Sequence, residues 1–161
     1  MNYSLYIASV ADDKRAAYSW CLVNYEGVAS EGVYLTHDER RFDETYCAHV
    51  ALQRALREAA RQAGKIRLRI VMDEVVSGAI GYEILDANRP LYPALLQTTK
   101  RVLRRFDDVE FAAFRKDDAD ALPEESAVID DAMTALEDSR TLAGQLRLWR
   151  DLIVKPSKFI R

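Results

Sequence analysis

Four acidic residues stand at the boundaries or in the early turns of the chain's predicted elements. Glu44 lies at the predicted start of a helix, Asp73 closes an apolar run, and Asp130 with Asp131 lies in the last long predicted helix. Each has a structural interpretation: Glu44 complements a helix start, Asp73 caps a short helix, and Asp130 is solvated helix surface. Carboxylates are also the ligands that hard divalent cations prefer. The sequence alone leaves both roles open for each residue.

Other reactive residue types do not form a recognisable site. The sequence has no Ser/His/Asp arrangement, no phosphate-binding glycine loop and no cysteine with a paired histidine. His37 and His49 are too isolated for a zinc site, and Cys21 and Cys47 are too far apart for a zinc knuckle and too few for a disulfide framework. We therefore interpret both cysteines as buried small apolar residues.

Strand patterns dominate the first 35 residues. Residues 3–10, 17–25 and 28–35 are rich in aromatic and branched side chains and are separated by polar or glycine-containing turns. This pattern predicts an antiparallel meander. Asp43 is then the predicted N-cap of a helix that ends near Gly64. Its apolar stripe is Ala48, Leu52, Ala55 and Ala59, and its other face, Arg54, Arg57 and Arg61, is predicted to be solvated.

The remaining chain alternates between strands and helices. A fourth strand is predicted over 66–72 and a fifth over 109–114, with a short helix over 75–80, a helix over 95–106 and a last helix from Pro123 to about Leu142. Because a helix separates the third and fourth strands, the fourth is expected to pair in parallel with the first. The fold class is therefore α/β, with a five-stranded mixed sheet and helices on both faces.

This element order resembles the ribonuclease H family over roughly residues 3–143, and three local segments strengthen the resemblance. Residues 43–52 look like the family helix that carries a catalytic Glu, which corresponds to Glu44. Residues 69–78 are similar to the strand that ends in a catalytic Asp, here Asp73, and the helix after the fifth strand offers Asp130, with Asp131 as a further candidate. The resemblance implies Mg²⁺ or Mn²⁺ bound by these acids, in a two-cation site that cuts phosphodiesters.

The sequence departs from the family pattern at important positions. Ala8 stands where the family has its first Asp, and a methyl group cannot bind a cation. Asp12 or Asp13 in the following turn could substitute only by reaching back toward the strand. Arg40 and Arg41 stand at the substrate-binding positions where the family has minor-groove asparagines, and the loop after the fifth strand has no histidine.

Charge divides the chain unevenly. The whole chain has a net charge of -3, but residues 140–161 hold six basic residues and one acidic residue, so the rest carries 17 basic and 25 acidic residues, a net charge of -8. We predict one domain over 1–143 and a basic tail over 144–161. The tail could contact nucleic acid or an acidic protein. With no basic leader and no long apolar run, the chain is expected to be cytoplasmic and not to span a membrane.

Two functions follow from the resemblance and the departures. The favoured one is a ribonuclease H-like protein with a degenerate carboxylate site, impaired in cleavage, that binds nucleic acid or a protein partner. The alternative is an active magnesium-dependent endonuclease that cuts RNA in RNA/DNA hybrids, with Ala8 introduced to silence it. We predict that Glu44, Asp73 and Asp130 converge at one end of the sheet. Ala8 is then expected beside them, and Ala8→Asp should restore cleavage if these acids form a properly spaced site.

Overall fold

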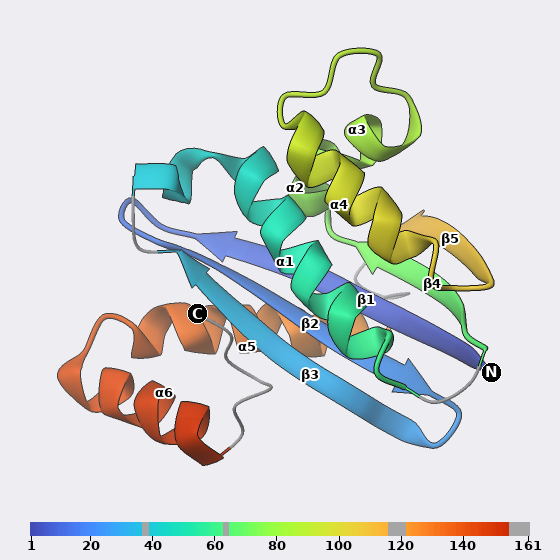
Figure 1. Ribbon diagram of the computed structural model, residues 1–161. Coiled ribbons are helices and arrows are strands. Elements are labelled where there is room, and N and C mark those ends of the chain that lie inside the picture. The colour runs from blue at the N-terminus through green and yellow to red at the C-terminus, as the bar shows by residue number, and fades with distance from the viewer. Residues whose placement is uncertain (37–38, 63–64, 116–121, 155–161) are drawn as a thin grey trace.

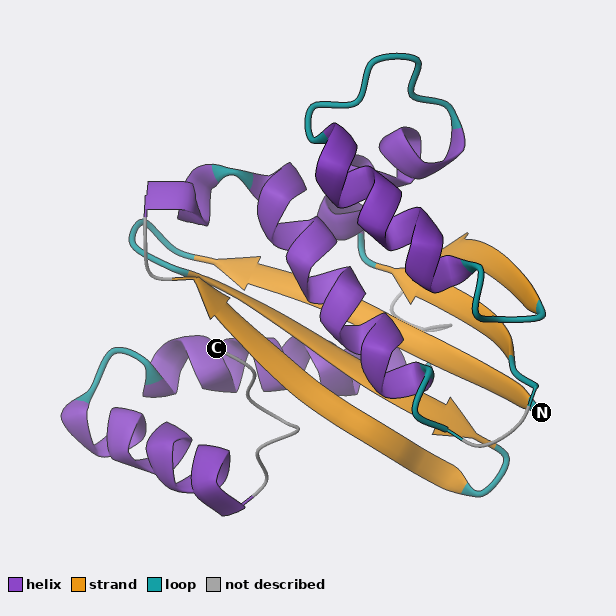
Figure 2. Ribbon diagram, in the orientation of Figure 1, coloured by secondary structure: helices purple, strands orange, loops and turns teal. Residues whose placement is uncertain are grey.

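The computed structural model describes residues 1–36, 39–62, 65–115 and 122–154. One five-stranded sheet has the order β3-β2-β1-β4-β5, with helices packed on both faces (Figures 1 and 2). The strands β1, β2 and β3 pair antiparallel, whereas β4 pairs in parallel with both β1 and β5. The predicted fold class is therefore confirmed. The strands are β1 (Asn2–Ala11), β2 (Ala16–Asn24), β3 (Gly27–Thr36), β4 (Arg67–Met72) and β5 (Asp108–Ala113).

Side-chain alternation along β1 determines which helices the sheet can bury. Leu5 and Ile7 belong to the large cluster under α1, while Tyr6 and Ala8 belong to the cluster under α5. Both faces of this central strand are therefore apolar, as expected for a strand covered on two sides. The turn between β2 and β3 is closed by Gly27, whose φ of 121° lies in a region that side chains disfavour.

One face carries the helices between β3 and β5. They enclose the large core cluster, in which α1 contributes the predicted stripe of Ala48, Leu52, Ala55 and Ala59. Asp43 is the N-cap of α1, because its carboxylate accepts a hydrogen bond from the Tyr46 amide at 3.0 Å. These elements are η1 (Glu39–Phe42), α1 (Glu44–Ala59), α2 (Glu74–Val76), the π-helical turn η2 (Ser77–Gly81), α3 (Tyr82–Leu85) and α4 (Pro93–Leu103).

The other face carries α5 (Pro123–Asp138), and α6 (Leu142–Val154) follows it (Figure 1). The prediction of one helix continuing to about Leu142 was wrong at its end. The side chain of Ser139 turns back to the Leu136 carbonyl, and the Thr141 hydroxyl accepts from the Gly144 amide, so a new helix begins. The proposed boundary between residues 143 and 144 lies inside α6.

Burial corrects one sequence interpretation and confirms another. Arg54 is not solvated: it is buried, with its guanidinium carbon 4.3 Å from the centre of the Tyr34 ring. Stacking on the aromatic ring accounts for this exception within the basic face of α1. Cys21 and Cys47 are buried and form no disulfide with each other, as expected. Among the described residues, no helix has both the length and the apolar character needed to cross a membrane.

Candidate functional site

Asp73 ends β4 and is held by main-chain donors on two sides. Its amide continues the β1–β4 ladder by donating to the Ile7 carbonyl at 3.1 Å. One carboxylate oxygen accepts from the Ser9 amide at 2.6 Å, and the other accepts from the Val76 amide at 2.7 Å. The side chain therefore extends the sheet toward β1 and also caps α2, which is the structural role that the sequence allowed.

Electrostatics place Glu44 at the same end of the sheet as Asp73. Burial raises the pKa of Tyr18, and its interactions with Cys47, Glu44 and Asp73 add to the effect. Burial also raises the pKa of Asp73, although the amides of Val76 and Ser9 oppose this shift. Glu44 is the exposed first residue of α1, next to its N-cap. These two acids therefore share one region, and Tyr18 lies close to both.

Ala8 lies beside Asp73 but is sealed from solvent. Ile7 pairs with Met72 in the parallel ladder, so Ala8 is level with Asp73. The methyl group of Ala8 has no exposed surface and packs in the cluster that contains Val128 of α5. This position offers an apolar contact where a cation-bridging carboxylate would be needed.

The acids after β1 are engaged in the turn and do not reach back toward Asp73. Asp12 accepts hydrogen bonds from the amides of Lys14 and Arg15, and Arg140 donates to its second oxygen at 2.8 Å. These contacts, led by the Lys14 amide, lower the pKa of Asp12. Asp12 thus joins the β1–β2 turn to the end of α5. Asp13 is exposed in the same turn.

Asp130 is not brought to Asp73. The residues of α5 that enter the sheet-facing clusters are Val128, Ala132, Ala135 and Leu136. At about 100° per residue, Asp130 lies on the opposite side of the helix, and it is exposed. Asp131 lies on a flank instead, close enough to Cys21 on β2 for its charge to contribute to that thiol's raised pKa.

The carboxylate arrangement does not fit a pair of divalent cations. Within the described ranges, no three His, Cys, Asp or Glu side chains lie together in a group that could hold a metal ion. Asp73 has both oxygens bonded to amides, Ala8 supplies no ligand, and Asp130 faces away from the sheet. A two-cation clamp needs several oxygen ligands converging on one space. We therefore derive no cleavage step from this site.

A cationic and aromatic cluster precedes α1. The guanidinium carbon of Arg40 lies 4.4 Å from the centre of the Tyr46 ring, and that of Arg41 lies 4.2 Å from the centre of the Phe42 ring. Phe42 is two-thirds exposed, and the ring of Tyr92 meets Tyr46 edge-on. The Nε atom of Arg41 is buried and has no hydrogen-bond partner in the described part of the chain. Planar cations next to exposed rings are suited to phosphates and bases.

Sequence reasoning missed a buried polar network between α1, α3 and α4. His49 Nε2 lies 2.8 Å from Glu83 Oε2, and His49 Nδ1 lies 3.1 Å from Thr99 Oγ1. Gln53 also donates to Thr99, and the Leu91 amide donates to the other Glu83 oxygen. A histidine inside an apolar helical stripe was the available signal. The hydroxyl, imidazole and carboxylate follow the order of a hydrolase triad, but Thr99 and His49 have no exposed surface, so the network is structural.

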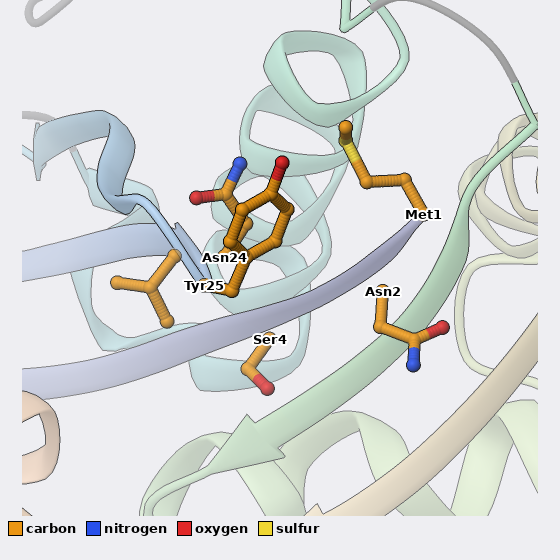
Figure 3. Close-up of a pocket in the computed structure, with 6 residues that line it drawn as sticks. Met1, Asn2, Ser4, Asn24 and Tyr25 are labelled. Atoms are coloured by element: carbon orange, nitrogen blue, oxygen red, sulfur yellow. The ribbon is translucent and has the colours of Figure 1, made fainter.

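A surface pocket of about 450 Å³ lies at the opposite end of β1 (Figure 3). Its wall consists of neutral side chains from the chain start and the β2–β3 hairpin: Met1, Asn2, Ser4, Val23, Asn24 and Tyr25. Ser4 is four residues before Ala8, a separation of roughly 13 Å along a strand. The pocket is thus separate from Asp73, and none of the side chains that line it is an acid or a base.

Comparison with known proteins identifies the architecture. No family model matches the sequence, and no curated protein matches it. Ribonuclease H1 from the halophilic archaeon Halobacterium salinarum NRC-1 superposes with a TM-score of 0.54 at 21% identity, over 82% of this chain and 100% of that chain. LC11-RNase H1, isolated from compost by a metagenomic approach, gives a TM-score of 0.63 at 13% identity, over 87% and 99%.

Two further solved structures have the same architecture. The N-terminal ribonuclease H domain of Rv2228c from Mycobacterium tuberculosis gives a TM-score of 0.59 at 15% identity, covering 87% of this chain and 99% of that one. LC11-RNase H1 in complex with an RNA/DNA hybrid gives 0.55 at 14% identity, covering 81% and 99%. Together with the sheet order and the helices on both faces, these similarities show that the chain has a ribonuclease H-like fold.

Proposed function

We propose that this protein is a ribonuclease H-like module that binds nucleic acid without cutting it. The observation that carries the proposal is Ala8, which is buried level with Asp73 where the two-cation site needs a ligand. Losing one ligand from such a clamp weakens cation binding and transition-state stabilisation together. Of the other acids, Asp73 has a structural role as the cap of α2, and Asp130 is exposed on the surface of α5.

Nucleic-acid binding is supported by the Arg40, Arg41 and Phe42 cluster. It stands next to α1, at the end of the sheet that holds Glu44 and Asp73, because the sulfur of Cys47 contacts the Arg40 carbonyl at 3.2 Å. LC11-RNase H1, a protein with the same fold, has been solved in complex with an RNA/DNA hybrid. A bound phosphate would pair with the guanidinium groups of Arg40 and Arg41, and the Phe42 ring would supply a stacking surface.

The absence of cleavage is tested first. Purified protein is incubated with labelled RNA/DNA hybrid, duplex RNA and single strands, each with Mg²⁺ or Mn²⁺. We expect no product above a metal-free control. Metal-dependent cleavage of the hybrid that Glu44→Gln abolishes would overturn the proposal in favour of an active endonuclease.

Binding is tested with a variant that changes charge but not length. Arg40→Gln combined with Arg41→Gln should weaken binding of a fluorescent hybrid about tenfold, because charge-assisted contacts to phosphate are lost. The salt dependence of binding should also become shallower. Lys100→Gln combined with Arg101→Gln, at exposed sites of α4, is the matched control with the same change of charge and should leave the affinity unchanged. Equal effects at both sites, or no measurable binding by the unmodified protein, would contradict the proposal.

A further inference from the structure

Helix α6 has an apolar stripe on its exposed side. Leu142, Leu146, Trp149 and Ile153 recur at intervals of four, three and four residues and are between 57% and 81% exposed. This spacing is the heptad pattern of a helix that packs along another helix. Isolated exposed apolar residues are common on proteins, but four in one line on one helix are not.

The packing of α6 on α5 fixes the direction of this stripe. Gly144 lies so close to α5 that a Cβ there would be 2.2 Å from the Asp138 carbonyl oxygen. Gly144 lies roughly opposite the stripe on the helix, at about 100° per residue. Arg147 approaches Asp138 at 3.8 Å on the same inner side. The stripe therefore points away from the protein's own core, and no residue of α6 belongs to a described core cluster.

We propose that the stripe on α6 docks against the same stripe of a second copy of this chain, around a two-fold axis. A two-fold interface brings a surface against itself, and a straight row of apolar residues is suited to such pairing. Covering the four side chains removes on the order of 500 Å² per copy, or about 1,000 Å² in total, which is where specific interfaces begin.

Charge favours a second copy over an unrelated apolar surface. Helix α5 holds six acidic residues and no basic one, whereas α6 holds two basic residues, Arg147 and Arg150, and one acidic residue, Asp151. In a two-fold arrangement the arginines of α6 in one copy can approach the acidic α5 of the other copy. Opposite charges across the seam steer the approach and oppose an alignment of like charges.

Sedimentation equilibrium on the full chain tests the pairing. We expect a monomer–dimer equilibrium in which Leu146→Glu raises the dimer dissociation constant at least tenfold, while Leu91→Glu leaves it unchanged. Leu91 is a matched control because it is 72% exposed, compared with 71% for Leu146. Glutamate suits the exposed helix α6 as well as leucine does, and Leu91 lies outside the helices, between α3 and α4. Circular dichroism melting verifies that both variants fold. A protein that stays monomeric at about 200 µM, or one that both variants disrupt equally, would overturn the proposal.

Tryptophan fluorescence gives a second, independent measurement. Trp20 has no exposed surface and reports a constant signal, whereas Trp149 lies in the stripe. Raising the protein concentration should shift the emission to shorter wavelength and reduce quenching by acrylamide, and Trp149→Phe should abolish both changes. Salt near 1 M should weaken the dimer, because charges beyond roughly 3 Å are then screened. A concentration-dependent shift that persists in Trp149→Phe would locate the contact elsewhere and contradict the proposal.

Discussion

Asp73 takes the place of a main-chain carbonyl at the end of β4. In a continuing ladder the Ser9 amide would donate to a carbonyl of β4, but here it donates to the Asp73 carboxylate at 2.6 Å. The same side chain caps α2 through Val76. Three parts of the fold therefore depend on one carboxylate, and burial raises its pKa despite these donors.

The raised pKa of Asp73 gives stability a definite pH dependence. The folded protein binds this proton more tightly than the unfolded chain, whose carboxyl has a pKa near 3.8. The favourable contribution of Asp73 protonation is thus fully present below pH 3.8 and is lost as pH rises through the folded pKa. The difference in free energy of unfolding between the wild type and Asp73→Asn should therefore fall as the pH rises from 3.8 through the folded pKa of Asp73. Urea denaturation at a series of pH values measures it, and a difference that rises instead would contradict the assigned direction.

Replacing Ala8 with Asp should destabilise the protein and leave cleavage absent. The new carboxylate would be buried against Val128 and level with Asp73, whose carboxylate would repel it. Burying an unpaired charge costs about 3–5 kcal/mol. Ala8→Asn is the size-matched neutral control, so the difference between the two melting curves isolates the charge. Restored Mg²⁺-dependent cleavage by Ala8→Asp would mean that α5 can rotate Asp130 toward the site.

At the scale of elements, the pairing of β2 with β3 depends on a close contact at one glycine. Gly32 is opposite Trp20 in the antiparallel register, and a Cβ on Gly32 would lie 2.2 Å from a carbon of the indole ring. Because Trp20 is fully buried, its ring has little room to move. Gly32→Ala should therefore lower the free energy of unfolding by about 1–3 kcal/mol. Gly78→Ala is the control, since its Cβ would meet nothing within 4 Å, and equal losses in both variants would reject this explanation.

The elements predictable from sequence are those set by local pattern. Alternation in β1 and β2 and the stripe of α1 follow from residue periodicity, and the observed strands differ from the predicted ones by a residue or two. The end of α5 was not predictable in this way, because Arg140 is drawn to Asp12, 128 residues away in sequence. The burial of Arg54 likewise depends on Tyr34, which lies on another element.

In the candidate site too, some positions follow from local sequence signals, whereas others depend on how distant elements pack. The positions of Glu44 and Asp73 at element boundaries were predictable, because N-caps and strand ends have local signals. The orientation of Asp130 could also be predicted from the sequence. Val128, Ala132 and Leu136 form the apolar stripe of the helix, and Asp130 lies on the opposite side. The network of His49, Glu83 and Thr99 could not be predicted from the sequence, because its members come together only when α1, α3 and α4 pack.

At the scale of the whole molecule, the core and the basic end of the chain are separable. The described core clusters use the sheet, α5 and the helices on the opposite face, and they include nothing after Leu136. The end of α5 is anchored independently of α6: Arg15 donates to the Ser139 carbonyl, and Arg140 pairs with Asp12 at 2.8 Å. The contacts that α6 adds at this junction are few, including the Gln145 side chain on the Ser139 carbonyl.

Truncation after Thr141 should therefore leave a folded protein that no longer self-associates. The cut removes five basic residues and one acidic residue, which changes the net charge from -3 to -7. The melting temperature should fall by only a few degrees, because about 1 kcal/mol of exposed helix contacts is lost and the core is intact. Hybrid binding should weaken as the more negative body repels phosphate, and the deficit should shrink at high salt, where that repulsion is screened. Thermal melting, sedimentation and fluorescence anisotropy measure the three outcomes, and a truncated chain that fails to fold would mean that α6 is part of the cooperative unit after all.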